Sequence, residues 1–224
     1  MKIVALKYGE SVFGENYIFK GGNKDKLLPI SFVIYLIQTE SKNILVDVGC
    51  DDGAGFEMSI FKKPVDILKE YGLDPTDITD VVITHAHYDH IEAIGYYENA
   101  TIHIQRDEYP KAKKYITNDF AVHLIDDEFA LTERVTVKKI GGHSTGSCIV
   151  VADNFVLCGD ECYYKKCLTD GIMTGASCNE ENCLQFLKVY RDEKYVPLLF
   201  HDPQILAGSV GNKTIFNKYM ELLS

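Results

Sequence analysis

Apolar and polar residues alternate along the chain with two periods, one typical of strands and one typical of helices. Short apolar runs rich in β-branched residues predict strands. These runs cover residues 3–6, 30–37, 44–48, 80–84, 101–105, 135–140, 148–151, 155–158 and 195–200. The turn-forming residues 41–43 and 153–154 separate consecutive runs so closely that they predict antiparallel hairpins.

Helical spacing of apolar residues predicts helices at residues 64–71, 107–115, 180–191 and 214–222. In the third helix, Leu184, Leu187 and Tyr190 share one stripe, and Asn179 can cap the first turn. The polar, glycine-containing stretch 9–26 is expected to be a long loop. Hairpins in both halves of the chain, interleaved with helices, indicate two packed sheets with helices outside.

Length and charge narrow the class of protein. The 224 residues contain no linker-like or low-complexity stretch, so we expect a single domain spanning residues 1–224. Acidic residues number 33 and basic residues 23, and the resulting charge of -10 repels phosphate backbones, which argues against a nucleic-acid partner. No apolar segment approaches the length of a membrane span, and the N-terminal apolar run, ended by Lys7, is too short for a secretory signal.

Seven cysteines are an odd number and lack Cys-x-x-Cys spacing, which favours reduced, buried side chains in a cytoplasmic protein over a disulfide framework. The expected partner is a small-molecule substrate, with no membrane partner, and a homodimer remains open.

One short segment concentrates potential metal ligands. His85, His87, Asp89 and His90 lie within six residues, directly after the apolar run at 81–83. Alternation in the extended part places His85 and His87 on one side, while Asp89 and His90 follow a turn and can face a second point nearby. Three imidazoles and a carboxylate are costly to bury unless they bind an ion. Imidazole and carboxylate are both groups that coordinate zinc.

Six residues cannot enclose two ions, so further ligands are expected downstream. His143, Asp160 and His201 each stand just after an apolar run, where loops at strand ends would build an open site. Each of these three residues alone is a weak signal, but together with the first segment they predict a metal centre. His103 and His123 match no such position and are expected to be ordinary surface or core residues.

This pattern, His-x-His-x-Asp-His followed by His, Asp and His, resembles that of the metallo-β-lactamase superfamily. The resemblance extends from residues 44–49 to His201. It implies an α+β fold, an αββα sandwich of two mixed β-sheets with helices on the outer faces and the metals at one edge.

The resemblance also implies roles for individual residues. His85, His87 and His143 would hold one ion, Asp89, His90 and His201 the second, and Asp160 would bridge them. The expected cofactors are two divalent metal ions, first zinc, with Mn2+ or Fe2+ as alternatives. Two ions about 3.5–4 Å apart can share a hydroxide, Asp89 could relay a proton to the leaving group, and Asp47 looks like the carboxylate that orients ligands.

Within the superfamily, the chain is most similar to the N-acyl homoserine lactonases. Tyr163 stands three residues after Asp160, where those enzymes carry a tyrosine that contacts the substrate, although a packing role for Tyr163 stays open. The family usually has Gly-Gly soon after the first motif, whereas Glu92-Ala93 stands here, which changes the floor of the pocket. Glu161 and Asp202 adjoin ligands and are either ligand-supporting or solvated acids.

These features predict a metal-dependent hydrolase acting on a lactone or ester carbonyl through a metal-bridging hydroxide. A glyoxalase-II-like thioesterase would share every ligand, but that family adds a helical segment after the last histidine, and 23 residues follow His201 here. A common β-lactamase would carry cysteine at position 160. A mononuclear iron persulfide dioxygenase of the same fold also remains an alternative, which metal analysis would test.

Overall fold

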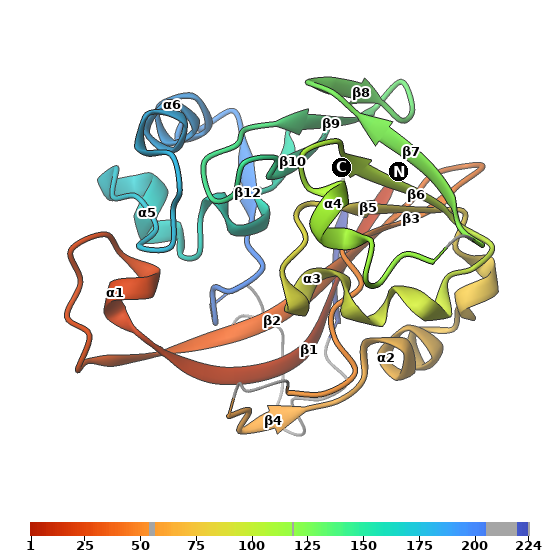
Figure 1. The fold of residues 1–224 in the computed structure, drawn as a ribbon, viewed down its shortest axis with the longest axis horizontal. Coiled ribbons are helices and arrows are strands. Elements are labelled where there is room, and N and C mark those ends of the chain that lie inside the picture. The colour runs from red at the N-terminus through yellow and green to blue at the C-terminus, as the bar shows by residue number, and fades with distance from the viewer. Residues whose placement is uncertain (54–56, 118, 205–218, 224) are drawn as a thin grey trace.

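The computed structural model describes residues 1–53, 57–117, 119–204 and 219–223. In this part of the chain the strands form two sheets that pack face to face (Figure 1). The larger sheet has the order β13 (Tyr219–Leu223), β1 (Lys2–Gly14), β2 (Leu27–Gln38), β3 (Asn43–Val46), β5 (Asp80–Ile83), β6 (Thr101–Gln105) and β7 (Ala121–Ile125), with β4 (Ile60–Phe61) beside β1. The smaller sheet has the order β12 (Val196–Leu198), β11 (Phe155–Leu157), β10 (Cys148–Ala152), β9 (Val135–Lys139) and β8 (Glu128–Ala130).

Both sheets are mixed. In the larger sheet, β2 pairs antiparallel with β1 and with β3, whereas β3, β5, β6 and β7 pair in parallel. In the smaller sheet, β12 lies parallel to β11 and the remaining pairs are antiparallel. The predicted hairpins are confirmed, because β2 pairs antiparallel with β3 and β10 with β11.

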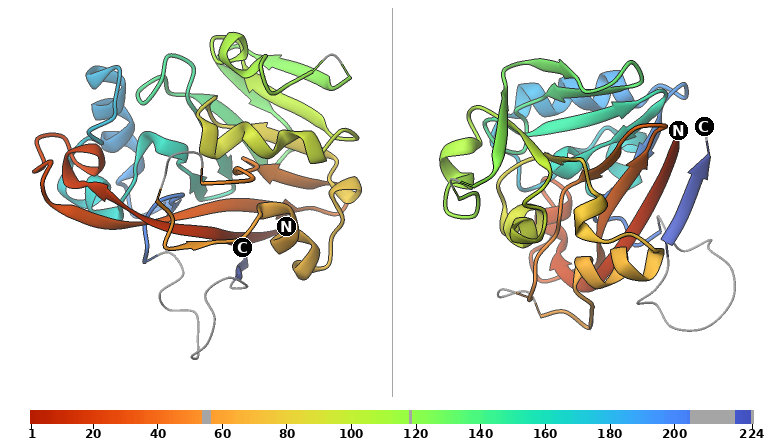
Figure 2. Two further views of the ribbon diagram at one scale, coloured as in Figure 1. Left: turned by 60° about the horizontal axis from the view of Figure 1, so that its bottom comes forward. Right: turned by 90° about the vertical axis from the view of Figure 1, so that its right-hand side faces the viewer.

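Helices cover the outer faces of the sandwich (Figure 2). The α-helices are α1 (Glu15–Ile18), α2 (Pro64–Tyr71), α3 (Tyr88–Ile91), α4 (Tyr109–Ala112), α5 (Lys165–Asp170) and α6 (Glu180–Tyr190). Three short 3-10 helices are η1 (Pro75–Asp77), η2 (Glu92–Tyr96) and η3 (Gly159–Glu161). This arrangement is the expected αββα sandwich. Among the described residues, none of the helices combines the length and apolarity that crossing a membrane requires.

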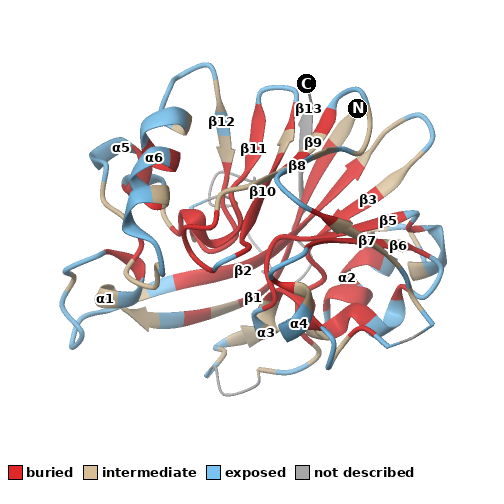
Figure 3. Cartoon of the chain, turned by 45° about the horizontal axis from the view of Figure 1, so that its top comes forward, coloured by how far each residue is buried: buried red, intermediate tan, exposed pale blue. Residues whose placement is uncertain are grey.

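The core has two layers because successive side chains of a strand point to opposite faces. In β2, Tyr35 and Ile37 belong to the cluster between the sheets, while Ile34 and Leu36 belong to the cluster that also holds Leu68 of α2. Buried residues accordingly fill the central strands, and exposed ones gather on the outer helices and loops (Figure 3). All seven cysteines are free, and all except Cys178 are buried, as expected.

The predicted loop at residues 9–26 is largely wrong. Residues 9–14 continue β1 and pair with residues 27–32 of β2, after a register shift between Lys7 and Gly9. We call residues 9–32 the arm; Figure 1 shows it extending beyond the sandwich, with α1 at its tip. The polar residues of the arm show no apolar alternation that would predict a strand. The strand forms there through backbone pairing with β2 rather than through a buried face.

The tip of the arm is fixed against the loop between α5 and α6. The Lys20 amide donates to Met173 O at 2.8 Å, and the Gly175 amide donates to Tyr17 O at 2.9 Å. A Cβ atom added at Gly175 would lie 1.6 Å from Asn16 O, so only glycine permits this close approach.

Two predicted helices need correction in detail. Asn179 caps α6 as expected, accepting from the Asn182 amide at 3.1 Å, but Leu184 is 50% exposed. The buried face of α6 instead contains Cys183, Phe186 and Leu187, which have an equally helical spacing and place the large Phe186 ring in the core. The helix predicted at 107–115 is limited to α4.

The helix predicted at 214–222 is also wrong where it can be checked. Residues 219–222 belong to β13, which pairs antiparallel with the outer edge of β1, and the rest of that range lies outside the described residues. Pairing with an open sheet edge satisfies backbone groups and overrides a helical pattern. Strands β4, β7 and β8 were not predicted, since each is short or half-exposed.

Candidate metal centre

The seven predicted ligands come from segments that leave the ends of strands. Segment 85–90 follows β5, with its last two ligands on α3. His143 lies in the loop after β9, Asp160 lies on η3 just after β11, and His201 follows β12. Strands of both sheets therefore deliver their following loops to the same edge of the sandwich.

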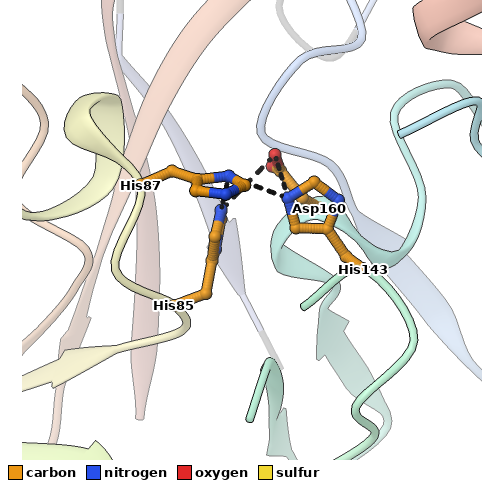
Figure 4. A group of neighbouring side chains, drawn as sticks. All are labelled: His85, His87, His143 and Asp160. Atoms are coloured by element: carbon orange, nitrogen blue, oxygen red, sulfur yellow. Dashed lines mark hydrogen bonds and ion pairs between the residues drawn. The ribbon is translucent and has the colours of Figure 1, made fainter. Parts of the chain in front are cut away.

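The first donor group consists of His85, His87, His143 and Asp160, whose ligand atoms all lie within 4.8 Å of one another. Figure 4 shows the three imidazoles and the carboxylate pointing toward a common centre. His87 Nδ1 lies 3.0 Å from both His85 Nε2 and His143 Nε2. Asp160 Oδ2 lies 3.6 Å from His85 Nε2 and 3.3 Å from His143 Nε2.

The second donor group consists of Asp89, His90 and His201, again within 4.8 Å of one another. Asp89 Oδ2 lies 3.7 Å from His90 Nε2 and 3.6 Å from His201 Nε2. The other oxygen of Asp160, Oδ1, lies 3.1 Å from His90 Nε2 and 3.0 Å from His201 Nε2. Asp160 thus directs one oxygen to each donor group.

These spacings fit metal coordination. Donor atoms around one tetrahedral ion, with bonds of about 2.1 Å, lie roughly 3.4 Å apart. Within the described part of the chain, His90 Nε2 and Asp160 Oδ1 are buried atoms without a hydrogen-bond partner. Since buried polar atoms are normally satisfied, orphaned donor atoms at the centre of such a group point to an ion.

Burial favours the neutral, metal-binding form of two imidazoles in the first donor group, whereas the neighbouring carboxylates raise the pKa values of His90 and His201 in the second. Burial, together with the neighbouring imidazoles, lowers the pKa of His85 well below its usual value, and it lowers the pKa of His143 to about 4. These imidazoles are therefore neutral at physiological pH. Burial opposes ionisation of Asp160 as well, but the surrounding histidines outweigh burial and keep the pKa of this carboxyl well below its usual range.

Hydrogen bonds on the far side of three imidazoles direct their Nε2 atoms inward. His90 donates from Nδ1 to Asp47 Oδ2 at 2.7 Å, and His201 donates from Nδ1 to the Ser31 carbonyl at 2.9 Å. Thr84 Oγ1 donates to Asp47 Oδ2 at 2.8 Å and so can accept from His85 Nδ1 at 3.1 Å. Each bond fixes the tautomer that leaves Nε2 free to bind a metal.

Asp47 supports these contacts from a backbone conformation that L-residues rarely adopt, with φ of 59°. Its Oδ1 accepts from the Thr84 amide at 2.7 Å, so one buried carboxylate holds both ends of the segment from Thr84 to His90. Backbone strain of this kind persists where the surrounding contacts enforce it.

Tyr163 belongs to the buried core cluster and also contacts both donor groups. Its hydroxyl donates to Asp160 Oδ2 at 3.0 Å, and its ring centroid is 4.9 Å from that of His201. The side chain is buried, and burial beside Asp160 raises the pKa of Tyr163 well above its usual value, so the phenol keeps its proton.

His103 and His123 lie outside both donor groups, as expected. His103 Nε2 pairs with Asp80 Oδ1 at 2.8 Å, and its Nδ1 lies 3.3 Å from His123 Nδ1.

Glu92 stands where the resemblance to the family leads us to expect a glycine. It accepts from the Asp51 amide at 2.7 Å through Oε2, so it holds the segment after Gly49.

Three acidic side chains beside the ligands are buried. Glu161 accepts from the His143 amide at 3.2 Å and so supports a predicted ligand. Asp202 is buried as well, but it accepts from the Lys165 amide at 2.8 Å and contacts none of the predicted ligands through that bond. No role for Glu108 was predicted from the sequence, because this residue falls within the helix predicted at 107–115. The one sequence feature that could have indicated a role is its position shortly after the strand predicted at 101–105.

Comparison with known proteins defines the class. Residues 33–172 match the model of the metallo-β-lactamase superfamily, a range that includes every proposed ligand except His201. The chain belongs to this superfamily, and the family together with the His/Asp cluster makes it a metal-dependent hydrolase.

Among curated proteins, the chain is 26% identical to the N-acyl homoserine lactonase AiiA of Bacillus thuringiensis subsp. kurstaki over 168 residues, covering 65% of this chain and 67% of the relative. It is 31% identical to a probable metallo-hydrolase of Methanocaldococcus jannaschii over 124 residues, covering 55% and 57%.

Among solved structures, an N-acyl homoserine lactone hydrolase with N-hexanoyl-L-homoserine bound at its catalytic metal centre shares the fold, with a TM-score of 0.79, 22% identity and 98% coverage of both chains. A dizinc quorum-quenching lactonase shares it with a TM-score of 0.70, 19% identity and coverage of 90% and 87%.

Proposed function

We propose that the two donor groups hold two divalent metal ions and that the enzyme hydrolyses a lactone or related ester. The position of Asp160, with one oxygen toward each donor group, carries this proposal. His85, His87 and His143 would complete the first site, and Asp89, His90 and His201 the second. Ions held there would supply an activated water as nucleophile near neutral pH.

Side chains of the protein would then stabilise the charge on the carbonyl oxygen and protonate the leaving group. Tyr163 keeps its proton and can donate a hydrogen bond to the oxygen on which negative charge develops during attack. Asp89 is only half-buried, unlike Asp160, and its carboxylate could take a proton from the attacking water and pass it to the leaving alkoxide. His87 is exposed, so a substrate can approach from its side.

An apolar wall for the rest of the substrate leads away from the second donor group. The Phe32 ring lies 5.3 Å from that of His201 and 6.3 Å from that of Phe13, which in turn lies 6.2 Å from Tyr17. Tyr17 is 56% exposed. Phe32 and Ile18 are fully buried and cannot contact a substrate, so the partly buried Phe13 and the exposed Tyr17 would form the surface of this wall.

Relatives support the lactone class. The curated relatives named N-acyl homoserine lactonases and the solved lactone hydrolases share the fold, and one of them is described as dizinc. A thioesterase of this fold would use the same ligand set, whereas a mononuclear iron oxygenase would need only part of it. The complete second donor group favours two ions over one.

A substrate screen on metal-defined protein tests the proposal. The purified enzyme should contain about two equivalents of zinc, manganese or iron per chain, and it should hydrolyse lactones with apolar tails faster than thioesters, phosphodiesters or β-lactams. A single iron, with oxygen consumed when a persulfide is added, would instead assign an oxidoreductase.

A further inference from the structure

Two buried carboxylates hold the loop that carries His143. Glu161 accepts from the amides of Gly142 and His143, each at 3.2 Å. Glu108 holds the later part of the loop: its Oε1 accepts from Ser144 Oγ at 2.8 Å and from the Gly146 amide at 2.9 Å. The loop from residue 142 to residue 147 is thus anchored along its length by side-chain acceptors.

Glu108 also reaches the other segment of the first donor group. Its Oε2 accepts from the Ala86 amide at 3.1 Å, and Ala86 lies between the ligands His85 and His87. One carboxylate therefore joins, through its two oxygens, the two segments that supply all three histidines of this group. A backbone bond from Cys148 to Thr84 joins the same segments outside the ligand-bearing residues.

The surroundings of Glu108 stabilise its contacts with the two segments. The side chain is 0% exposed, and the Lys111 ammonium lies 3.8 Å away. A Cβ atom added at Gly146 would lie 2.2 Å from Gln105 Oε1 and 3.0 Å from Glu108 Cγ, so the loop backbone approaches as closely as glycine allows. A buried carboxylate is costly unless it is well hydrogen-bonded, and here three donors satisfy it.

We propose that Glu108 is a positioning residue for the first metal site, a role that rests on the proposed two-ion function. It sets the distance between His143 and the His85–His87 pair without binding metal itself. The second donor group is oriented by Asp47 and by the Ser31 carbonyl. Loss of Glu108 should therefore weaken the first site selectively.

Glu108→Gln tests this role at nearly constant size. An amide has one oxygen, so it cannot accept from Ala86 on one side and from Ser144 and Gly146 on the other, and at least one segment is released. Outer contacts of this kind typically change metal affinity by roughly ten- to a hundredfold. In competition with a graded chelator, E108Q should lose one ion that much more readily, while the second ion keeps its wild-type affinity.

The spectrum of the cobalt-loaded protein identifies which ion is weakened. The absorption bands that E108Q loses should be those lost by His87→Ala, a change in the first donor group, and should differ from those lost by His201→Ala. Ser144→Ala removes one of three donors to Glu108 and should give a smaller shift of the same kind, which keeps the test available if E108Q folds poorly.

Asp80→Asn is the matched control. Asp80 is 3% exposed and accepts from His103, Lys42 and Thr79, all outside the metal centre. D80N should lose stability but keep both metal affinities. Wild-type affinities in E108Q, equal weakening of both ions, or the same metal loss in D80N would each overturn the role of Glu108. If the wild-type protein binds only one ion, the two-ion function is wrong. In that case the role of Glu108 is tested on the single ion, and an unchanged affinity for it in E108Q would overturn the positioning role.

Discussion

Asp160 faces both donor groups, so its substitution is expected to have the largest effect of any single ligand change. Asp160→Ala removes a bond from each ion and leaves their mutual repulsion unscreened. Metal analysis of the purified variant should show near-complete loss of both ions, whereas His87→Ala should retain about one. His103→Ala, outside both groups, should leave metal content and turnover unchanged; a metal-free His103→Ala protein would contradict the ligand assignment.

Tyr163 tests how the carbonyl is recognised. Tyr163→Phe deletes the phenolic donor and keeps the ring that packs near His201. We expect kcat/KM for lactones to fall roughly ten- to a hundredfold, corresponding to about 1.4–3 kcal/mol for one lost donor, with metal content intact. If steady-state kinetics show the same rate across a lactone series, Tyr163 serves packing alone.

The residues of the two donor groups could be predicted from the sequence because metal chemistry limits the residue types and strand ends limit the positions. His85 and His87 follow a strongly apolar strand, and Asp160 and His201 repeat that placement. Glu108 could not be found in this way. Its function depends on which amides approach it in space, and the loop after His143 reaches it across 36 residues of sequence.

At the level of elements, predictability follows burial. Helix α2 was predicted with correct bounds because Pro64, Ile67 and Leu68 are buried at the helical spacing i, i+3 and i+4. Gly72 ends the helix with φ of 106°. The buried strand β5 was likewise predicted from its apolar run. The strands of the arm were not predicted as such between residues 9 and 14, because they are paired through the backbone while many of their side chains remain exposed. In α6 two stripes had similar spacing, and only packing against the sheet selects Phe186 over Leu184.

The arm leads to a prediction about substrate length. Tyr17 lies at the outer end of the row of rings that starts beside His201. Tyr17→Ala should lower kcat/KM for esters with long apolar tails by about fivefold, equivalent to roughly 1 kcal/mol of partial apolar contact, and should leave short substrates unaffected. Leu184→Ala, an exposed site on α6, is the control. Equal effects on short and long substrates would exclude a tail-binding role for the arm.

At the scale of the whole molecule, the contact between the two sheets could not be derived from local sequence. Strands β5, β6 and β7 pair in parallel across long connections, so their order depends on distant contacts. One result is a polar cluster remote from the metal centre. His103 binds Asp80 within the larger sheet, and its ring stacks on Phe129 of the smaller sheet at 5.4 Å between centroids. Asp80 thus supports a link between the sheets.

The charge of Asp80 predicts how this link responds to acid. Burial alone would raise the pKa of Asp80, but hydrogen bonds from His103, Lys42 and Thr79 outweigh burial and lower the pKa below its usual range. The folded state therefore binds the proton less readily than the unfolded chain, whose aspartate pKa is about 3.9. The stabilisation is fully present above the unfolded value and is lost as pH falls through it toward the folded value.

Asp80→Asn should accordingly destabilise the metal-free protein by roughly 1.5–3 kcal/mol at pH 7, a range typical of hydrogen bonds to a charged group. The difference between the variant and the wild type should shrink steadily below about pH 4, because the unfolded wild-type chain then takes up a proton at Asp80 that the folded protein resists. Urea unfolding at a series of pH values, with a chelator present so that metal ligands do not contribute, measures this difference. Lys138→Met, a change in an exposed ion pair with Glu128, should show little effect at any pH. A free-energy difference for D80N that stays constant down to pH 2 would show that packing, rather than the charge of Asp80, stabilises the link between the sheets.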